Sequence, residues 1–144
     1  MEHTSSVTFT GGMSFDVEAD GHHFAVDADE QFGGKDLGPK PKKLLLSALA
    51  GCTGMDVVLI LTKMRMPFDK FWLEVSAELD ELQEPAVYTA FRIRYCFTGT
   101  ELDREKIEKA VNLSEEKYCG VSAMFKSFAS VSTEIILNPK LMEK

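Results

Sequence analysis

An apolar stretch from residue 44 to residue 61 constrains the fold of this chain more than any other feature. It reads LLLSALAGCTGMDVVLIL and is long enough on paper to cross a bilayer. Asp56 argues against a membrane span, because an acidic group near the centre of a spanning helix costs roughly 2.5–3.5 kcal/mol. The sequence offers no second apolar span to shelter that charge. We therefore interpret the stretch as a buried core helix and expect no membrane partner.

Prolines on either side indicate where this helix begins and ends. Pro39 and Pro41 suit a first helical turn, where a missing N–H is harmless, and Pro67 ends the helix after Met66. About 24 residues at 1.5 Å each make a rod of roughly 36 Å. A chain of 144 residues has difficulty covering such a rod on every face, as a helix that is apolar all round requires. We expect a second copy of the chain to complete the cover, so that the protein is a homodimer.

Apolar residues alternate with period two on both sides of the helix, which predicts strands. Before the helix, Asp20-Gly21 is a two-residue hairpin turn, and we expect two or three antiparallel strands there. After it, alternation over 71–79 and 91–97 predicts a long hairpin with a loop around Pro85. The glycine-rich segment 32–39 lacks the spacing of a phosphate cradle and is interpreted as a flexible connection. These patterns predict one α+β domain, 1–144, with antiparallel sheets around a long buried central helix.

A second, amphipathic helix is expected in the last third of the chain. Thr100 and Asp103 resemble a capping box at its start, and Cys119-Gly120 breaks it. A short helical turn over 121–125 and a strand over 129–137 complete the sequence. The residues expected on the buried face of the helix are Ile107, Ala110, Val111, Ser114 and Tyr118.

Charge and composition exclude several classes of protein. The chain has 16 Lys+Arg against 23 Asp+Glu, a formal net charge of −7, and its arginines begin only at Arg65. A nucleic-acid binder usually shows a basic stripe, so we expect no nucleic-acid partner. With 44% hydrophobic and 27% charged residues, the composition is that of a globular protein. The first residues, MEHTSSVTFT, do not resemble a secretory signal, which predicts a cytoplasmic protein.

The three cysteines, Cys52, Cys96 and Cys119, are the candidates for chemistry. They are too few for a disulfide framework, and the sequence has no C-x-x-C or His-rich cluster, so we expect neither a metal nor a cofactor. Cys52 lies at the middle of the predicted helix among small residues, which let a second backbone or a slim ligand approach closely. Cys119 lies at a helix break, where free N–H groups favour a thiolate. Spacing alone does not decide whether these thiols are reactive or inert, because free cysteines are often buried and inert.

Two segments resemble a known family. The stretch GPKPKKLLLSALAGCTGMDV, residues 38–57, is similar to the Pro-x-x-leucine-rich-Ala-x-Cys helix of the OsmC/Ohr family, the osmotically inducible and organic hydroperoxide resistance proteins. The stretch LDREKIEKAVNLSEEKYCGVSAMF, residues 102–125, resembles the late helix of that family with its second cysteine. Together with the strands on both sides, the resemblance covers nearly the whole chain.

The resemblance implies an OsmC-like fold in an intertwined homodimer, with the long helices side by side at its centre. It also implies reduction of organic hydroperoxides by two thiols, with Cys52 as the nucleophile and Cys119 as the resolving cysteine. A thiolate attacks the peroxide and becomes a sulfenic acid, which condenses with a nearby thiol to a disulfide. A dithiol reductant then restores both thiols. Cys96 matches no family position and is expected to be structural.

The sequence departs from the family pattern at the groups that activate the nucleophile. Peroxidase members carry an N-terminal arginine and, ten residues before the first cysteine, a glutamate that holds it. Here no arginine precedes Arg65, and Lys42 stands at the position of the glutamate. Helix geometry separates Lys42 from Cys52 by roughly 15 Å, so a partner subunit would have to deliver Lys42 as the activating cation.

Two functions are therefore open. One is a two-cysteine peroxidase that acts on small or fatty hydroperoxides, which the retained cysteines favour. The other is a non-catalytic dimeric binding protein with an apolar pocket, which the missing activating pair favours. Asp56 lies one helical turn after Cys52, where its charge opposes a thiolate or where it makes a polar contact across the dimer.

Overall fold

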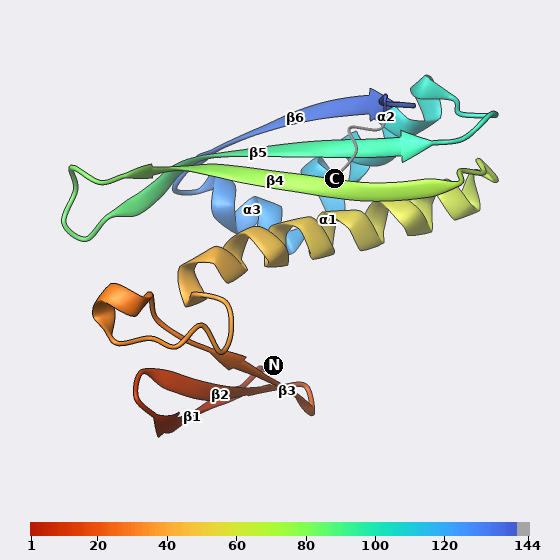
Figure 1. Ribbon diagram of the computed structural model, residues 1–144. Helices are drawn as coiled ribbons and strands as arrows, with labels where there is room; N and C mark the ends of the chain where they lie inside the picture. Colours follow the sequence, from red (N-terminus) through yellow and green to blue (C-terminus); the bar gives the residue numbers. More distant parts are fainter. Residues whose placement is uncertain (141–144) are drawn as a thin grey trace. The chain divides into compact units, whose positions relative to one another are not determined.

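The computed structural model describes residues 1–140, and the chain forms two compact units, 1–45 and 46–144. Each unit holds one three-stranded sheet (Figure 1). The structure confirms the α+β class, with two sheets and a long helix between them in sequence. The interpretation of residues 1–144 as a single domain stays a prediction.

The first unit is an antiparallel sheet of strands β1 (Ser5–Gly11), β2 (Ser14–Ala19) and β3 (His22–Val26) in that order. The predicted turn at Asp20-Gly21 joins β2 to β3, and both of its residues have positive φ, 55° and 79°. A two-residue turn of this kind matches the twist of the flanking strands. The expectation of two or three strands before the long helix is therefore confirmed.

The loop that follows β3 is held by a buried carboxylate, so the interpretation of 32–39 as a merely flexible connection is wrong. Asp27 is 2% exposed and accepts hydrogen bonds from the backbone N–H groups of Ala28, Lys35 and Leu37. These bonds lower the pKa of Asp27 to about 2, because they stabilise its charged form. A Cβ at Gly34 would collide with the backbone of Ala28, so the segment is packed against its own chain.

The second unit is a sheet of β4 (Lys70–Asp80), β5 (Val87–Thr98) and β6 (Ser130–Leu137). Strands β4 and β5 form the predicted long antiparallel hairpin. Strand β6 pairs with β5 in parallel, which corrects the expectation of purely antiparallel sheets. A parallel return needs a crossover connection, and the helices between β5 and β6 provide it.

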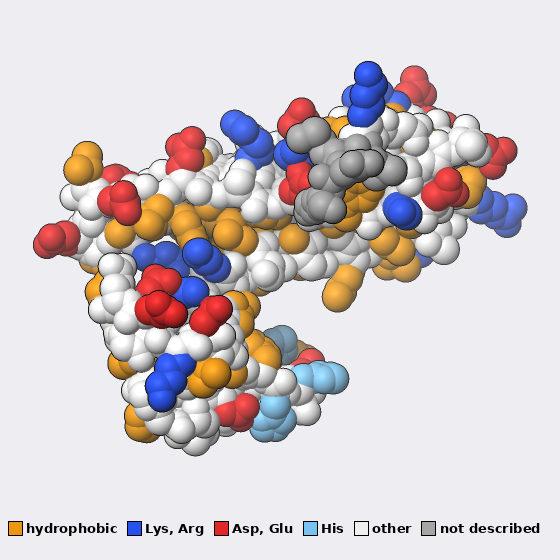
Figure 2. Space-filling view, viewed as in Figure 1, with side chains coloured by type: hydrophobic (Ala, Val, Ile, Leu, Met, Phe, Trp, Pro, Cys, Tyr) orange, Lys and Arg blue, Asp and Glu red, His pale blue; other side chains and the backbone are white. Residues whose placement is uncertain are grey.

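The long helix α1 (Leu44–Lys63) follows a 3₁₀ turn at Pro41–Lys43 and packs on this sheet with only one of its faces. That face consists of Leu49, Thr53, Gly54, Val57 and Leu61, which recur at helical spacing. Expected burial on nearly all sides is not observed within one chain, because Met55, Val58 and Leu59 are exposed. Hydrophobic side chains gather along the lower edge of this unit in Figure 2.

By length and composition alone, Pro41–Lys63 qualifies as a membrane-crossing helix. Core helices of soluble proteins satisfy the same test. In this chain Leu49, Val57 and Leu61 of the helix are fully buried in the same hydrophobic core as Phe91 of β5. On this face α1 is therefore a core helix of the second unit.

The crossover contains α2 (Arg104–Leu113), a π-helical turn at Ser114–Tyr118, labelled η3, and α3 (Gly120–Lys126). The N-cap of α2 is Asp103, whose carboxylate accepts from the N–H of Lys106, so the expected cap at Thr100 is wrong. The π-helical turn shifts the helical phase, and Tyr118 is exposed instead of joining the buried face. The other four predicted face residues, Ile107, Ala110, Val111 and Ser114, are buried.

Candidate functional site

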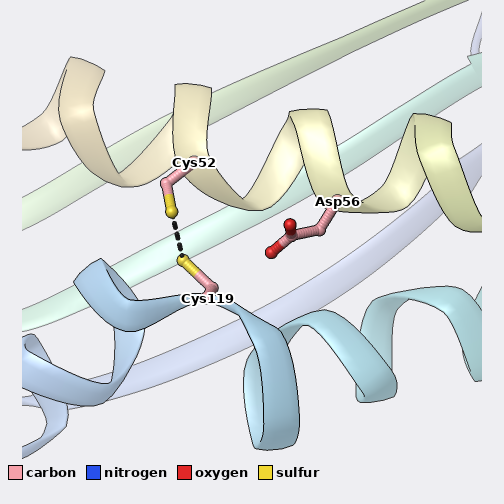
Figure 3. A group of neighbouring side chains, drawn as sticks. All are labelled: Cys52, Asp56 and Cys119. Atoms are coloured by element: carbon pink, nitrogen blue, oxygen red, sulfur yellow. Dashed lines mark hydrogen bonds between the residues drawn. The ribbon is translucent and has the colours of Figure 1, made fainter.

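The two cysteines that the sequence singled out meet in the structure. The Cys119 thiol donates a hydrogen bond to Cys52 Sγ, with 3.0 Å between the two sulfurs (Figure 3). Both are free thiols. Closing the gap to the ~2.05 Å of a disulfide needs a movement of about 1 Å. The pair is thus placed for reversible disulfide chemistry.

Helix α1 positions Cys52 and fixes what surrounds it. Cys52 is half-buried, one residue before Thr53, which faces the sheet and donates its hydroxyl to the carbonyl of Leu49. The small neighbours have separate roles: a Cβ at Gly54 would lie 2.9 Å from Leu73, whereas one at Gly51 would meet open space. Small residues therefore serve close packing on one side of Cys52 and leave the other side open.

The break after η3 positions Cys119. Its backbone is extended, with φ −80° and ψ 101°, and its sulfur accepts the N–H of Ser122 as the N-cap of α3. Cys119 is 3% exposed, and this burial, together with the neighbouring Cys52, raises its pKa to about 11. Cys119 therefore holds its proton firmly and donates it in the hydrogen bond to Cys52 Sγ.

Asp56 is the charged group next to the two sulfurs. Its carboxylate lies with both of them in a cluster whose ligand atoms are all within 4.8 Å of one another, and it points toward them in Figure 3. Oδ2 of Asp56 accepts the hydroxyl of Ser114, 3.0 Å away and fully buried at the start of η3. Asp56 thus makes one polar contact within its own chain, and a contact across the dimer stays a prediction.

A buried tyrosine and a glutamate form a hydrogen-bonded pair close to Cys119. The sequence analysis did not identify either of them as a site residue. Tyr95 of β5 is fully buried and donates to Glu115 Oε1 at 3.1 Å. Burial raises the pKa of both groups, and for Tyr95 the Glu115 charge adds to the rise. The alternation of β5 gave Tyr95 an inward position, but it carried no sign of an acidic partner. Glu115 directly follows Ser114, and its local sequence gave no sign of a partner on β5.

The other two sequence candidates lie elsewhere. Cys96 is buried on β5, in register with Trp72 and Ile136, and alternation places it on the sheet face opposite Tyr95. Burial raises its pKa, with a further contribution from Glu74. Lys42 is an exposed residue of the 3₁₀ turn in the first unit. Its role as activating cation stays a prediction.

A mostly apolar hollow of about 470 Å³ opens beside the cluster. This volume is within the range of small-ligand pockets. Asp56, which lies beside the two sulfurs, is part of its wall. It is lined by Asp56, Leu59, Ile60, Lys63, Met64, Leu113 and Tyr118.

Comparison with known proteins identifies the family of this site. Residues 33–134 match the family model described as OsmC-like protein. The chain belongs to the OsmC-like family. Protein YhfA of Escherichia coli (strain K12) is 31% identical over 127 residues, which cover 88% of this chain and 91% of YhfA. The family resemblance of the two cysteine segments is therefore confirmed.

Solved structures share the OsmC-like fold. A hypothetical protein from Aquifex aeolicus VF5 is 26% identical with a TM-score of 0.80, covering 96% of this chain and 99% of that chain. An organic hydroperoxide resistance protein OsmC from Legionella pneumophila has a TM-score of 0.70 at 16% identity, covering 94% and 97%. At that identity the second likeness shows the fold alone.

Proposed function

We propose that this OsmC-like protein is a cytoplasmic, homodimeric peroxidase that reduces organic hydroperoxides with Cys52 and Cys119. The observation that carries the proposal is the 3.0 Å contact between the two sulfurs, in a family that includes organic hydroperoxide resistance proteins. Cysteines that only fill a core are not expected to place their sulfurs in contact from two separate helical segments. A nucleophilic and a resolving cysteine have to reach each other, because they form a disulfide.

The geometry supports one assignment of roles. Cys52 is the more exposed of the two sulfurs and accepts the hydrogen bond, as a nucleophilic thiolate does. It attacks the outer peroxide oxygen, the O–O bond breaks, and the alcohol leaves after taking up a proton. Cys119 then attacks the sulfenic acid, which forms the disulfide and releases water. A dithiol reductant supplies the two electrons that return both thiols.

The hollow beside Asp56 supports an organic substrate. Its wall is dominated by Leu59, Ile60, Met64 and Leu113, which suit an alkyl or aryl group better than water or hydrogen peroxide. Burying a substituent of that size contributes about 1.5–3 kcal/mol, or roughly tenfold or more in rate against an unsubstituted peroxide.

The experiment is a thiol-dependent peroxide consumption assay on the wild-type protein. Cumene hydroperoxide should be consumed about tenfold or more faster than hydrogen peroxide at equal concentration, because only the former gains apolar contacts. Cys96→Ser serves as the control and should match the wild type. Equal rates with both peroxides would contradict the proposal that the substrate is an organic hydroperoxide. If neither peroxide is consumed, the protein is not a peroxidase and the binding-protein alternative is favoured.

That alternative is a non-catalytic dimeric binding protein that uses the same hollow. It is favoured by the absence of any arginine before Arg65 and by Asp56, whose charge opposes a thiolate at Cys52. In the peroxidase, a cation must offset this charge. We infer that the partner subunit delivers Lys42, since helix geometry places the Lys42 of the same chain roughly 15 Å away along the axis.

Replacing Lys42 by Met tests that inference. The pH midpoint of Cys52 alkylation should rise by about one pH unit, because a nearby cation favours the thiolate. Peroxide turnover at neutral pH should fall in parallel. Lys43→Met, which removes the neighbouring charge of the same 3₁₀ turn, is the matched control. An unchanged midpoint in Lys42→Met would make Lys42 an ordinary residue of the helix start.

A further inference from the structure

We propose that Cys52, Asp56 and Cys119 form a three-ligand Zn²⁺ site in the reduced protein. The inference goes beyond the proposed peroxidase and does not depend on it. From the sequence we expected no metal, because it has no C-x-x-C motif or His-rich cluster. The structure instead gathers three ligand atoms from two helical segments within 4.8 Å of one another (Figure 3).

The arrangement of the three groups fits a tetrahedral ion. Cys52 and Asp56 are four residues apart on α1 and present their side chains on one face, while Cys119 approaches from the start of α3. With Zn–S near 2.3 Å, two thiolates on a tetrahedral zinc lie about 3.7 Å apart. The two sulfurs, now at 3.0 Å, need to separate by less than about 1 Å.

Neighbouring groups orient the ligands from behind, as in established metal sites. The Ser114 hydroxyl donates to Oδ2 of Asp56 and leaves Oδ1 for the ion. The N–H of Ser122 donates to the sulfur of Cys119. Both serines are fully buried, so these supports are fixed by packing. Because Cys52 is only half-buried, water can occupy the fourth position.

Charge favours a cation at this point. Cys52, Asp56 and Cys119, whose ligand atoms all lie within 4.8 Å of one another, are each anionic when ionised. A pair of thiolates beside a carboxylate is costly without a positive partner, and a divalent ion supplies one. Thiolates select Zn²⁺ over the hard ions Mg²⁺ and Ca²⁺. On binding, the two thiols release two protons to solvent, so no oxidant or reductant is needed.

The test is Zn²⁺ titration of the reduced full-length protein against a chromophoric chelator, with Co²⁺ as a spectroscopic probe. We expect one Zn²⁺ to bind per chain. The Co²⁺ form should show thiolate-to-Co²⁺ charge-transfer bands, together with the intense visible bands of a tetrahedral site. Cys52→Ser and Cys119→Ser should each weaken binding by about 100-fold or more, at least as much as loss of a supporting group. Asp56→Asn keeps the acceptor for Ser114 and should weaken binding by about tenfold or more.

Cys96→Ser is the matched control and should bind like the wild type. Circular dichroism of each variant establishes that it is folded. Binding of equal affinity in wild type and folded Cys52→Ser would overturn the site, as would loss of binding in Cys96→Ser. Peroxide consumption by protein stripped with a chelator tests the proposed function separately, because that reaction uses no metal.

Discussion

Cys119→Ser is expected to stop catalytic reduction of an organic hydroperoxide while leaving a single turnover intact. Cys52 still attacks the peroxide and becomes a sulfenic acid, but no thiol lies 3.0 Å away to condense with it. Cys52→Ser removes the nucleophile and should lose the first turnover as well, a fall of order 10³-fold or more in rate. Rapid-quench measurement of alcohol formed per protein chain separates the two outcomes.

The serine at position 119 is chosen to keep the local structure. Cys119 caps α3 by accepting from the N–H of Ser122, and serine is among the preferred N-cap residues. In the wild type, peptide mapping after limited peroxide treatment and alkylation should find a Cys52–Cys119 disulfide, with Cys96 alkylated as a free thiol. A disulfide that contains Cys96, or continued turnover by Cys119→Ser, would refute the assigned roles.

Met55→Lys is expected to convert a dimer into a monomer. Met55 is 76% exposed within one chain, on the apolar face of α1 that leaves Val58 and Leu59 uncovered. A mostly apolar hollow of about 550 Å³ lies along the same face, and we propose that a second copy covers it. In a two-fold dimer the lysine is buried twice, at several kcal/mol for each unpaired charge, which raises the dissociation constant by about 10³-fold or more.

Sedimentation measures this directly. The wild type should sediment at about 32 kDa, twice the 16.1 kDa of the chain, with an interface well over ~2,000 Å² as in obligate dimers. Leu82→Lys is the matched control, because it adds the same charge at a residue that is 97% exposed in the loop between β4 and β5. A wild-type chain that is a stable, folded monomer at micromolar concentration would be incompatible with the intertwined dimer.

Local pattern in the sequence was sufficient for most of the secondary structure. Period-two alternation predicted the β4–β5 hairpin, and the run from Leu44 to Leu61 predicted α1, because these signals lie within each element. The start of α2 was misplaced at Thr100 because a capping box and a single Asp103 cap look alike in sequence. The π-helical turn that exposes Tyr118 left no local signal.

The contacts that make a site could be found only from the tertiary structure. Cys52 and Cys119 were recognisable as a pair through the family resemblance, yet their approach depends on the packing of α3 beside α1. The hydrogen bonds from Ser114 to Asp56 and from Tyr95 to Glu115 join residues on different elements, so no spacing rule could connect them.

Periodicity and caps depend on neighbours along the backbone and can therefore be read from the sequence. The cluster of two thiols and a carboxylate depends on where a parallel β6 and its crossover helices place η3 and Cys119 over α1. That placement follows from the burial of apolar surface by the whole second unit, which is a property of the complete packed core and of no single segment.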